Sequence, residues 1–178
     1  MKIVVLTGSP HKAGTSFLLA DNFIQGAKES GHEIFRFDAA FEKVHPCIGC
    51  NQCQCGKHAC VFQDSITKLY PKLLEADLVA FVTPLYYHGA SAQIKAAIDR
   101  FHGIDDLIRN TAKKAVLIVT AADTEERIMN GVVGTYMETL HYLNWQDCGK
   151  VLAINSYTRE DIEKTDYPMQ AYQLGKNL

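Results

Sequence analysis

Short runs of β-branched and apolar residues alternate along this chain with longer stretches of helical periodicity, and this alternation constrains the fold most. Three of the runs are apolar almost throughout, as in strands covered by helices on both faces. Because consecutive parallel strands are joined by crossover helices, the pattern predicts an α/β fold with a doubly wound five-stranded parallel sheet and helices on both faces. The predicted strands are Lys2 to Thr7, Glu33 to Phe37, Leu78 to Val82, Ala115 to Thr120 and Val151 to Ile154.

The stretches between these runs carry apolar residues every three to four positions, which predicts helices. Pro71 lies inside the second stretch and predicts a kink there, or two short helices. No repeat, low-complexity tract or linker divides the 178 residues, so we expect one domain over residues 1–178.

Charge and hydropathy exclude two classes of partner. A net charge of −2 with scattered Lys and Arg gives no basic stripe for nucleic acid. No stretch approaches the roughly 18 consecutive apolar residues that a membrane span needs. The apolar run from Ile3 to Leu6 is too short for the core of a signal peptide. We therefore expect a cytoplasmic protein with no membrane partner.

Ligands of doubly wound sheets bind beyond the carboxyl ends of the strands, so the loops there are the candidate sites. The loop after the first strand reads GSPHKAGTS and runs directly into a helix. Hydroxyls, the Lys12 ammonium and free helix N–H groups suit an anion. The loop matches neither the dinucleotide nor the nucleoside-triphosphate glycine pattern, so a phosphate monoester fits best. The alternative is a connector without a ligand.

The loop after the third strand reads TPLYYHGAS and combines aromatic side chains with a flexible glycine. Such a loop can cover a flat ring and bring backbone N–H groups to its edge. The alternative is that Tyr86 and Tyr87 only cap the core.

Five of the six cysteines fall between Cys47 and Cys60. Without an export signal, this crowding argues against a disulfide framework. The C-x2-C-x2-C spacing with one more cysteine downstream can bind a four-iron, four-sulfur cluster; a zinc site and free or redox-active thiols are the alternatives. The candidate ligands are Cys47, Cys50, Cys53 and Cys60, with Cys55 as a spare.

These segments, GSPHKAGTS, PCIGCNQC, LLEADLVAFVTPLYYHGASAQIKAAIDRF and the closing AYQLGKNL, together resemble the NADPH-dependent FMN reductase family of flavodoxin-like proteins. The cysteine motif is similar to that of the iron–sulfur flavoproteins, a branch of the same fold. The resemblance implies that the FMN phosphate is held by Ser9, Lys12, Gly14, Thr15 and Ser16. It implies that the isoalloxazine ring is lined by Pro84, Leu85, Tyr86, Tyr87, His88 and Gly89, with Thr120 and Ala121 in the loop after the fourth strand.

The resemblance further implies an FMN-dependent oxidoreductase. Electrons would pass from NADH or NADPH through FMN to a small acceptor (a flavin, a quinone or a nitro compound) or to a redox partner protein. A [4Fe-4S] cluster would be a second cofactor, and the protein would form a homodimer or higher homo-oligomer. No catalytic side chain is nominated, because the flavin supplies the chemistry. The alternatives are a non-enzymatic electron carrier and a thiol or metal sensor.

Overall fold

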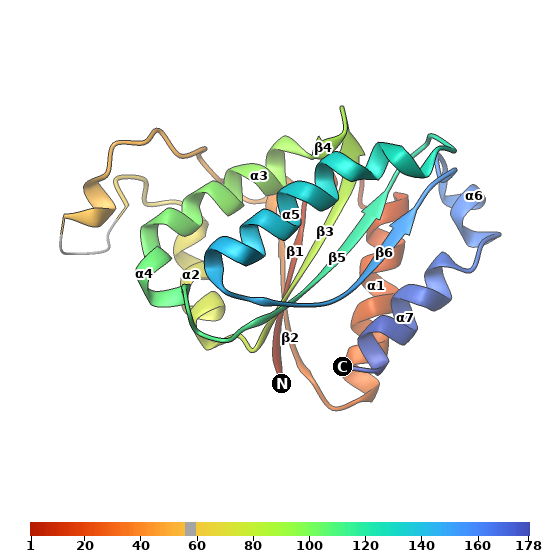
Figure 1. Ribbon diagram of the computed structural model, residues 1–178, viewed down its shortest axis with the longest axis horizontal. Helices are drawn as coiled ribbons and strands as arrows, with labels where there is room; N and C mark the ends of the chain where they lie inside the picture. Colours follow the sequence, from red (N-terminus) through yellow and green to blue (C-terminus); the bar gives the residue numbers. More distant parts are fainter. Residues whose placement is uncertain (56–59) are drawn as a thin grey trace.

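The structure is a computed structural model that describes residues 1–55 and 60–178. Its central sheet has the strand order β2-β1-β3-β5-β6, with every neighbouring pair parallel, and the short strand β4 pairs antiparallel with the end of β3 (Figure 1). The predicted doubly wound parallel sheet is confirmed. The strands are β1 (Lys2–Thr7), β2 (Glu33–Asp38), β3 (Leu78–Tyr86), β4 (Gly89–Ala90), β5 (Lys114–Thr120) and β6 (Gln146–Ala153).

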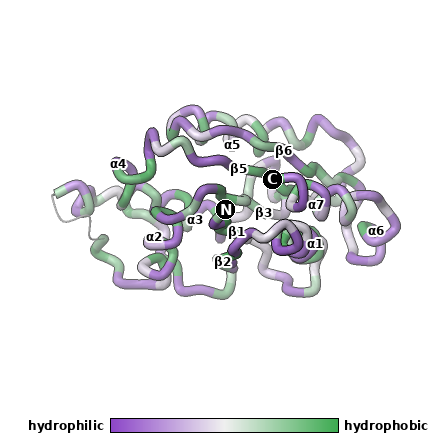
Figure 2. The backbone as a smooth tube through the Cα atoms, turned by 90° about the horizontal axis from the view of Figure 1, so that it is seen from below, coloured by the Kyte–Doolittle hydropathy of each residue, from purple (hydrophilic) through white to green (hydrophobic). Residues whose placement is uncertain are grey.

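The two faces of the sheet are buried under separate groups of helices. Successive residues of one strand point to opposite faces, so Val4 and Leu6 pack in one core and Ile3 and Val5 in the other. One face is covered by α1 (Thr15–Glu29), α6 (Arg159–Glu163) and α7 (Tyr167–Lys176). The other is covered by α2 (Ile66–Glu75), α3 (Ala92–Asp99), α4 (Asp105–Ile108) and α5 (Asn130–Leu143). Seen from below in Figure 2, α1, α6 and α7 lie together, apart from α2, α3 and α4.

Short 3-10 turns join several of these elements: η1 (Ala39–Phe41), η2 (Gln52–Gln54), η3 (Arg100–Ile104) and η4 (Glu126–Met129). Of the two outcomes expected at Pro71, the pair of short helices is wrong, since α2 continues through Pro71 as one helix. Proline removes the N–H that would bond the carbonyl of Thr67. Thr67 is exposed, so water can replace that bond.

Helices α1 and α7 touch through their backbones. A Cβ atom on Gly26 would lie 2.1 Å from the carbonyl oxygen of Tyr172, and one on Gly175 would lie 2.1 Å from the carbonyl oxygen of Phe23. The two glycines therefore allow a closer approach than any side chain would permit. None of the helices in residues 1–55 and 60–178 has both the length and the apolar character needed to cross a bilayer.

Candidate functional site

The carboxyl ends of β1, β3, β5 and β6 surround one cavity of about 460 Å³. This volume falls in the range of about 300–1,000 Å³ that is usual for small-molecule sites. Segments more than 70 residues apart in sequence thus meet at one place, because parallel strands deliver their following loops to the same edge of the sheet. The cavity is lined by Ser9, His11, Gly14, Thr15, Ser16, Pro84, Leu85, Tyr86, Thr120, Ala121, Ala122, Ser156 and Tyr157.

The start of α1 forms a polar wall of this cavity. Gly14 is the N-cap residue and no side chain caps the helix, so its first N–H groups are available to a ligand. The first turn contains no acidic residue, and none of the lining residues is Asp or Glu. This wall therefore favours a bound anion, which the positive end of the helix dipole attracts.

Three hydroxyl groups connect this helix to the end of β5. Thr15 Oγ1 donates to Thr120 Oγ1 at 3.1 Å, and Ser16 Oγ lies 2.8 Å from Thr120 Oγ1. Ser16 and Thr120 are buried. Three hydroxyls carry three protons, and these two bonds use two of them. One O–H donor is left for a ligand beside the helix N-terminus.

The β3–β4 hairpin forms the opposite wall. Pro84, Leu85 and Tyr86 line the cavity, and Tyr86 is 43% exposed. Tyr87 and His88 occupy the turn with φ angles of 46° and 62°, the left-handed conformation that a tight two-residue hairpin requires. Their side chains are exposed, and neither lines the cavity.

Nine of the thirteen residues predicted to bind the cofactor line the cavity: Ser9, Gly14, Thr15, Ser16, Pro84, Leu85, Tyr86, Thr120 and Ala121. Tyr87, His88, Gly89 and Lys12 are not among the lining residues. The Lys12 ammonium lies instead over the ring of Phe41, 4.5 Å from its centroid.

Ser156 and Tyr157, which follow β6, were missed as lining residues. The signal for them was available, because the rule that ligands bind beyond the carboxyl ends of strands applies to the fifth predicted strand as well. Ser156 is buried and fixed by its own N–H, which donates to the Ala121 carbonyl at 2.9 Å. Tyr157 is 81% exposed and borders the opening.

The cysteine segment, which we define as the described residues 45–55 and 60–64, projects beyond α3 and α4 in Figure 1. No cysteine is among the residues that line the cavity. Cys53 is the buried thiol of the segment. Burial raises its pKa, and the nearby Cys60, Cys47 and Cys50 raise it further.

The predicted cluster ligands do not form a preformed metal cage. Within residues 1–55 and 60–178, no three His, Cys, Asp or Glu side chains converge on a point that could hold a metal ion. Cys47, Cys50 and Cys55 are exposed, and Cys60 is half-buried. The described geometry gathers the thiols in one segment without arranging them as a set of metal ligands.

Comparison with known proteins agrees with this architecture. A sequence profile of the family described as NADPH-dependent FMN reductase matches residues 1–159. An iron-sulfur flavoprotein of Methanocaldococcus jannaschii is 34% identical over 100 residues, which are 56% of this chain and 51% of that protein. The chain spans about half the length of the iron-sulfur flavoproteins that it matches.

Two solved structures have the same fold. The NAD(P)H:quinone oxidoreductase from Methanothermobacter marburgensis superposes with a TM-score of 0.79 at 18% identity, covering 99% of this chain and 95% of that one. The azoreductase from Bacillus anthracis superposes with a TM-score of 0.77 at 15% identity, covering 100% of both chains. At these identities the superpositions establish the fold alone.

Proposed function

The chain belongs to the NADPH-dependent FMN reductase family, and from that premise we propose that it binds FMN in the carboxyl-edge cavity and passes electrons from NAD(P)H to an acceptor. Residues 1–178 would act as one FMN-binding domain in the cytoplasm. The observation that carries the proposal is that the α1 N-terminus and the β3–β4 hairpin face one cavity. A single elongated ligand with an anionic end and a flat end would satisfy both walls.

The polar wall fits the phosphate of FMN. It offers helix N–H groups, the Ser9 hydroxyl, the one O–H donor that the bonds among Thr15, Ser16 and Thr120 leave over, and no carboxylate. We propose that Lys12 leaves the Phe41 ring to join the phosphate when FMN binds. The hairpin residues Pro84 to Gly89 would lie along the ring, together with Ala121.

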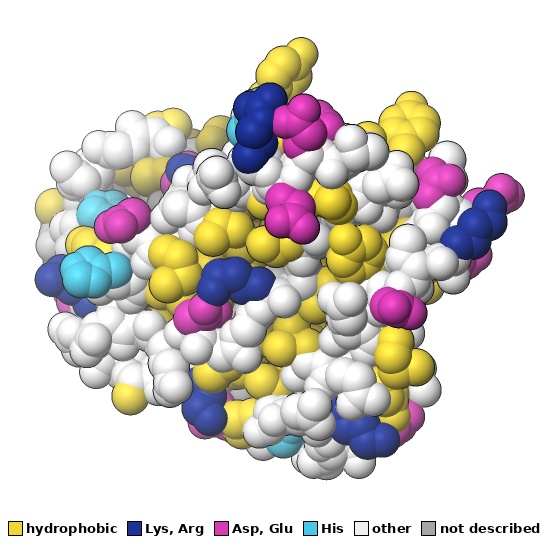
Figure 3. Space-filling view, turned by 45° about the vertical axis from the view of Figure 1, so that its right-hand side comes forward, with side chains coloured by type: hydrophobic (Ala, Val, Ile, Leu, Met, Phe, Trp, Pro, Cys, Tyr) yellow, Lys and Arg dark blue, Asp and Glu magenta, His cyan; other side chains and the backbone are white. Residues whose placement is uncertain are grey.

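The bound flavin would supply the hydride-accepting chemistry, and the protein would supply binding, orientation and shielding from water. No side chain in the cavity is assigned an acid or base role. The acceptor would be a small molecule such as a quinone, flavin or nitro compound, or a redox protein. Figure 3 shows hydrophobic side chains reaching the surface on the side that carries β6, which is compatible with the homodimer or higher homo-oligomer that we propose.

The proposal is tested by adding FMN and then NADPH or NADH to the purified protein without oxygen. We expect flavin fluorescence to be quenched on binding, and the absorbance near 450 nm to bleach on reduction. Adding a quinone should restore the absorbance. If FMN binds but neither nicotinamide reduces it, the protein is an electron carrier. If FMN does not bind at millimolar concentration, the proposal is wrong.

Replacing Thr120 with valine should weaken FMN binding about tenfold, or about 1.4 kcal/mol. Valine keeps the shape of the side chain but removes the oxygen that joins Thr15 and Ser16. Thr120→Ser should bind FMN almost as the parent does, and Thr139→Val, on α5 outside the cavity, is the matched control. Binding is measured by fluorescence titration with FMN and with riboflavin. Equal weakening for both ligands would contradict a role of Thr120 in the phosphate wall.

A second cofactor is favoured by one specific observation: Cys47, Cys50, Cys53 and Cys60 lie near one another in a chain whose matched relatives include iron-sulfur flavoproteins. We propose that Cys47, Cys50, Cys53 and Cys60 bind a [4Fe-4S] cluster after the exposed thiols rearrange. Protein purified without oxygen should then contain about four iron atoms per chain and absorb near 400 nm. Colourless protein without iron, after reconstitution with iron and sulfide, would exclude this proposal.

A further inference from the structure

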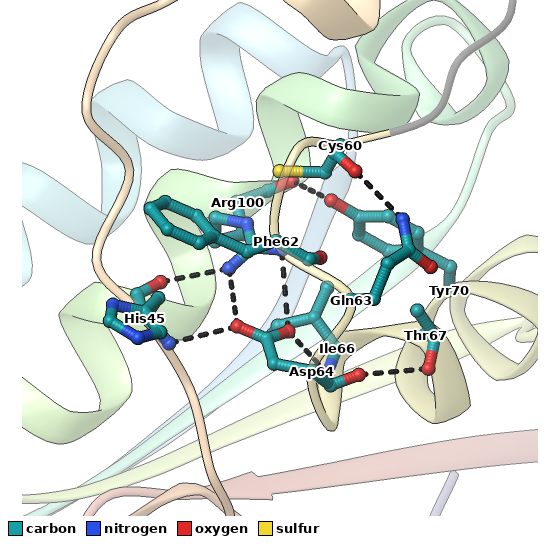
Figure 4. A network of polar contacts seen from close by, with 9 residues as sticks. All are labelled: His45, Cys60, Phe62, Gln63, Asp64, Ile66, Thr67, Tyr70 and Arg100. Carbon is teal, nitrogen blue, oxygen red and sulfur yellow. Dashed lines mark hydrogen bonds and ion pairs between the residues drawn. The ribbon is translucent and has the colours of Figure 1, made fainter.

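The base of the cysteine segment is closed by a buried ion pair between Asp64 and Arg100 (Figure 4). Arg100 is the first residue of η3, directly after α3, and its side chain is 2% exposed; that of Asp64 is 7% exposed. The guanidinium Nη1 lies 2.8 Å from the Asp64 carboxylate. The same guanidinium donates to the carbonyl oxygens of His45, at 2.9 Å, and Phe62, at 3.2 Å.

These bonds hold the two ends of the segment against each other. The His45 N–H donates to Asp64 Oδ2 at 2.9 Å. The rings of His45 and Phe62 stack with centroids 4.4 Å apart and an interplanar angle of 8°. Arg100 thus contacts the chain at both ends of the segment. Figure 4 shows His45 from one end and Phe62 from the other lying around its guanidinium.

A buried ion pair is a weak way to add stability, because desolvating two charges offsets most of their attraction. Burial alone would raise the pKa of Asp64. The hydrogen bonds from Arg100, His45 and Ile66 outweigh this and hold that pKa below its ordinary value. A hydrophobic pair could fill the same space, but it would not bind the carbonyls of His45 and Phe62. The pair is therefore better explained by the geometry that it imposes than by net stabilisation.

The same turn also contacts η2 and the residue before it. The carbonyl oxygen of His102, in η3, accepts from Gln54 Nε2 at 2.8 Å and from the Cys53 thiol at 3.9 Å. The His102 ring nitrogen Nε2 lies 3.3 Å from Asn51 Oδ1. One short turn of η3 thus contacts the cysteine segment at its base and at η2, which carries the buried Cys53.

We propose that η3 holds the cysteine segment in place, with Arg100 and Asp64 as positioning residues. These protein contacts, and not a bound metal, then keep Cys53 shielded from solvent. The contacts of η3 with residues 51–54 then exist before any metal binds, and removing a metal does not release Cys53. The inference concerns thiol accessibility alone, so it stands or fails separately from the FMN proposal.

The test measures how fast iodoacetamide alkylates each cysteine, by mass spectrometry of the digested protein. In the parent, Cys53 should react slowly both as purified and after treatment with an iron or zinc chelator. In Arg100→Met, Cys53 should react at least tenfold faster, while Cys148 in β6 keeps its rate. Arg100→Lys should restore part of the protection. Lys95→Met, which removes an exposed ion pair of the neighbouring helix α3, should react as the parent does.

A double variant distinguishes local exposure of Cys53 from unfolding of the whole protein. Arg100→Met leaves the Asp64 carboxylate buried without its partner, whereas Arg100→Met with Asp64→Leu removes both charges. The double variant should keep the parent's circular dichroism and still expose Cys53. The inference is overturned if Cys53 stays protected in that variant, if its rate rises only together with that of Cys148, or if the chelator alone exposes Cys53 in the parent.

Discussion

Replacing Gly8 with alanine should lower the affinity for FMN at least about a hundredfold, or about 2.7 kcal/mol. Gly8 joins β1 to the loop that borders the cavity, and a Cβ atom there would lie 2.4 Å from Ser91 Oγ and 2.6 Å from Ile94 Cβ. Its N–H donates to the Val82 carbonyl at 2.9 Å, and its carbonyl accepts from Ser91 Oγ at 2.7 Å. The loop is thus bonded on both sides and has no room for a methyl group.

The Gly8→Ala substitution should disturb both walls of the cavity. Ser91 is the N-cap of α3 and its N–H donates to Thr83 Oγ1 at 3.0 Å, so displacing its hydroxyl disturbs the end of β3 as well. FMN affinity is measured by fluorescence titration, with circular dichroism as the check of folding. The matched control is Gly134→Ala in α5, where an added Cβ would meet no atom within 4 Å. A folded Gly8→Ala variant with the parent's affinity would show that the site lies elsewhere.

The fully buried strands could be predicted from the sequence, because a strand covered on both faces is apolar at every position. β1 was predicted with its observed bounds, and β5 within one residue. β6 was predicted from Val151 but begins at Gln146, because an edge strand can be polar where solvent reaches it. The two-residue strand β4 has no pattern of its own; it exists because Tyr87 and His88 turn the chain back.

The site could be predicted only as far as topology determines it. Parallel strands bring the loops after β1, β3 and β5 together whatever their conformation, and the predicted residues of the cavity lie in these loops. Conformation within a loop depends on contacts that no local pattern contains. Lys12 lies over Phe41, and the hairpin turns the side chains of Tyr87 and His88 into solvent. The cysteine spacing likewise gave no sign of the ion pair between Asp64 and Arg100 at the base of the segment.

The contact between α1 and α7 could not be predicted either, since Gly26 and Gly175 are 149 positions apart and each lies within an ordinary helical stretch. In the structure they let the two backbones meet. Buried side chains on the same two helices, such as Phe23 and Ala171, then close over one face of the sheet. The contact between these helices therefore determines how closely the core on that face of the sheet is packed.

Gly175→Ala should accordingly lower the free energy of unfolding by about 3 kcal/mol, since a methyl group 2.1 Å from the Phe23 carbonyl oxygen forces the helices apart and opens the packing beneath them. Alanine also raises helix propensity, which offsets up to about 1 kcal/mol of that loss. Gly134→Ala measures this gain alone, because Gly134 is exposed and a Cβ added there would meet no atom within 4 Å beyond the backbone of its own helix. The difference between the two variants in urea unfolding is therefore the cost of the contact. If both variants were equally stable, α7 could not lie against α1 at this distance.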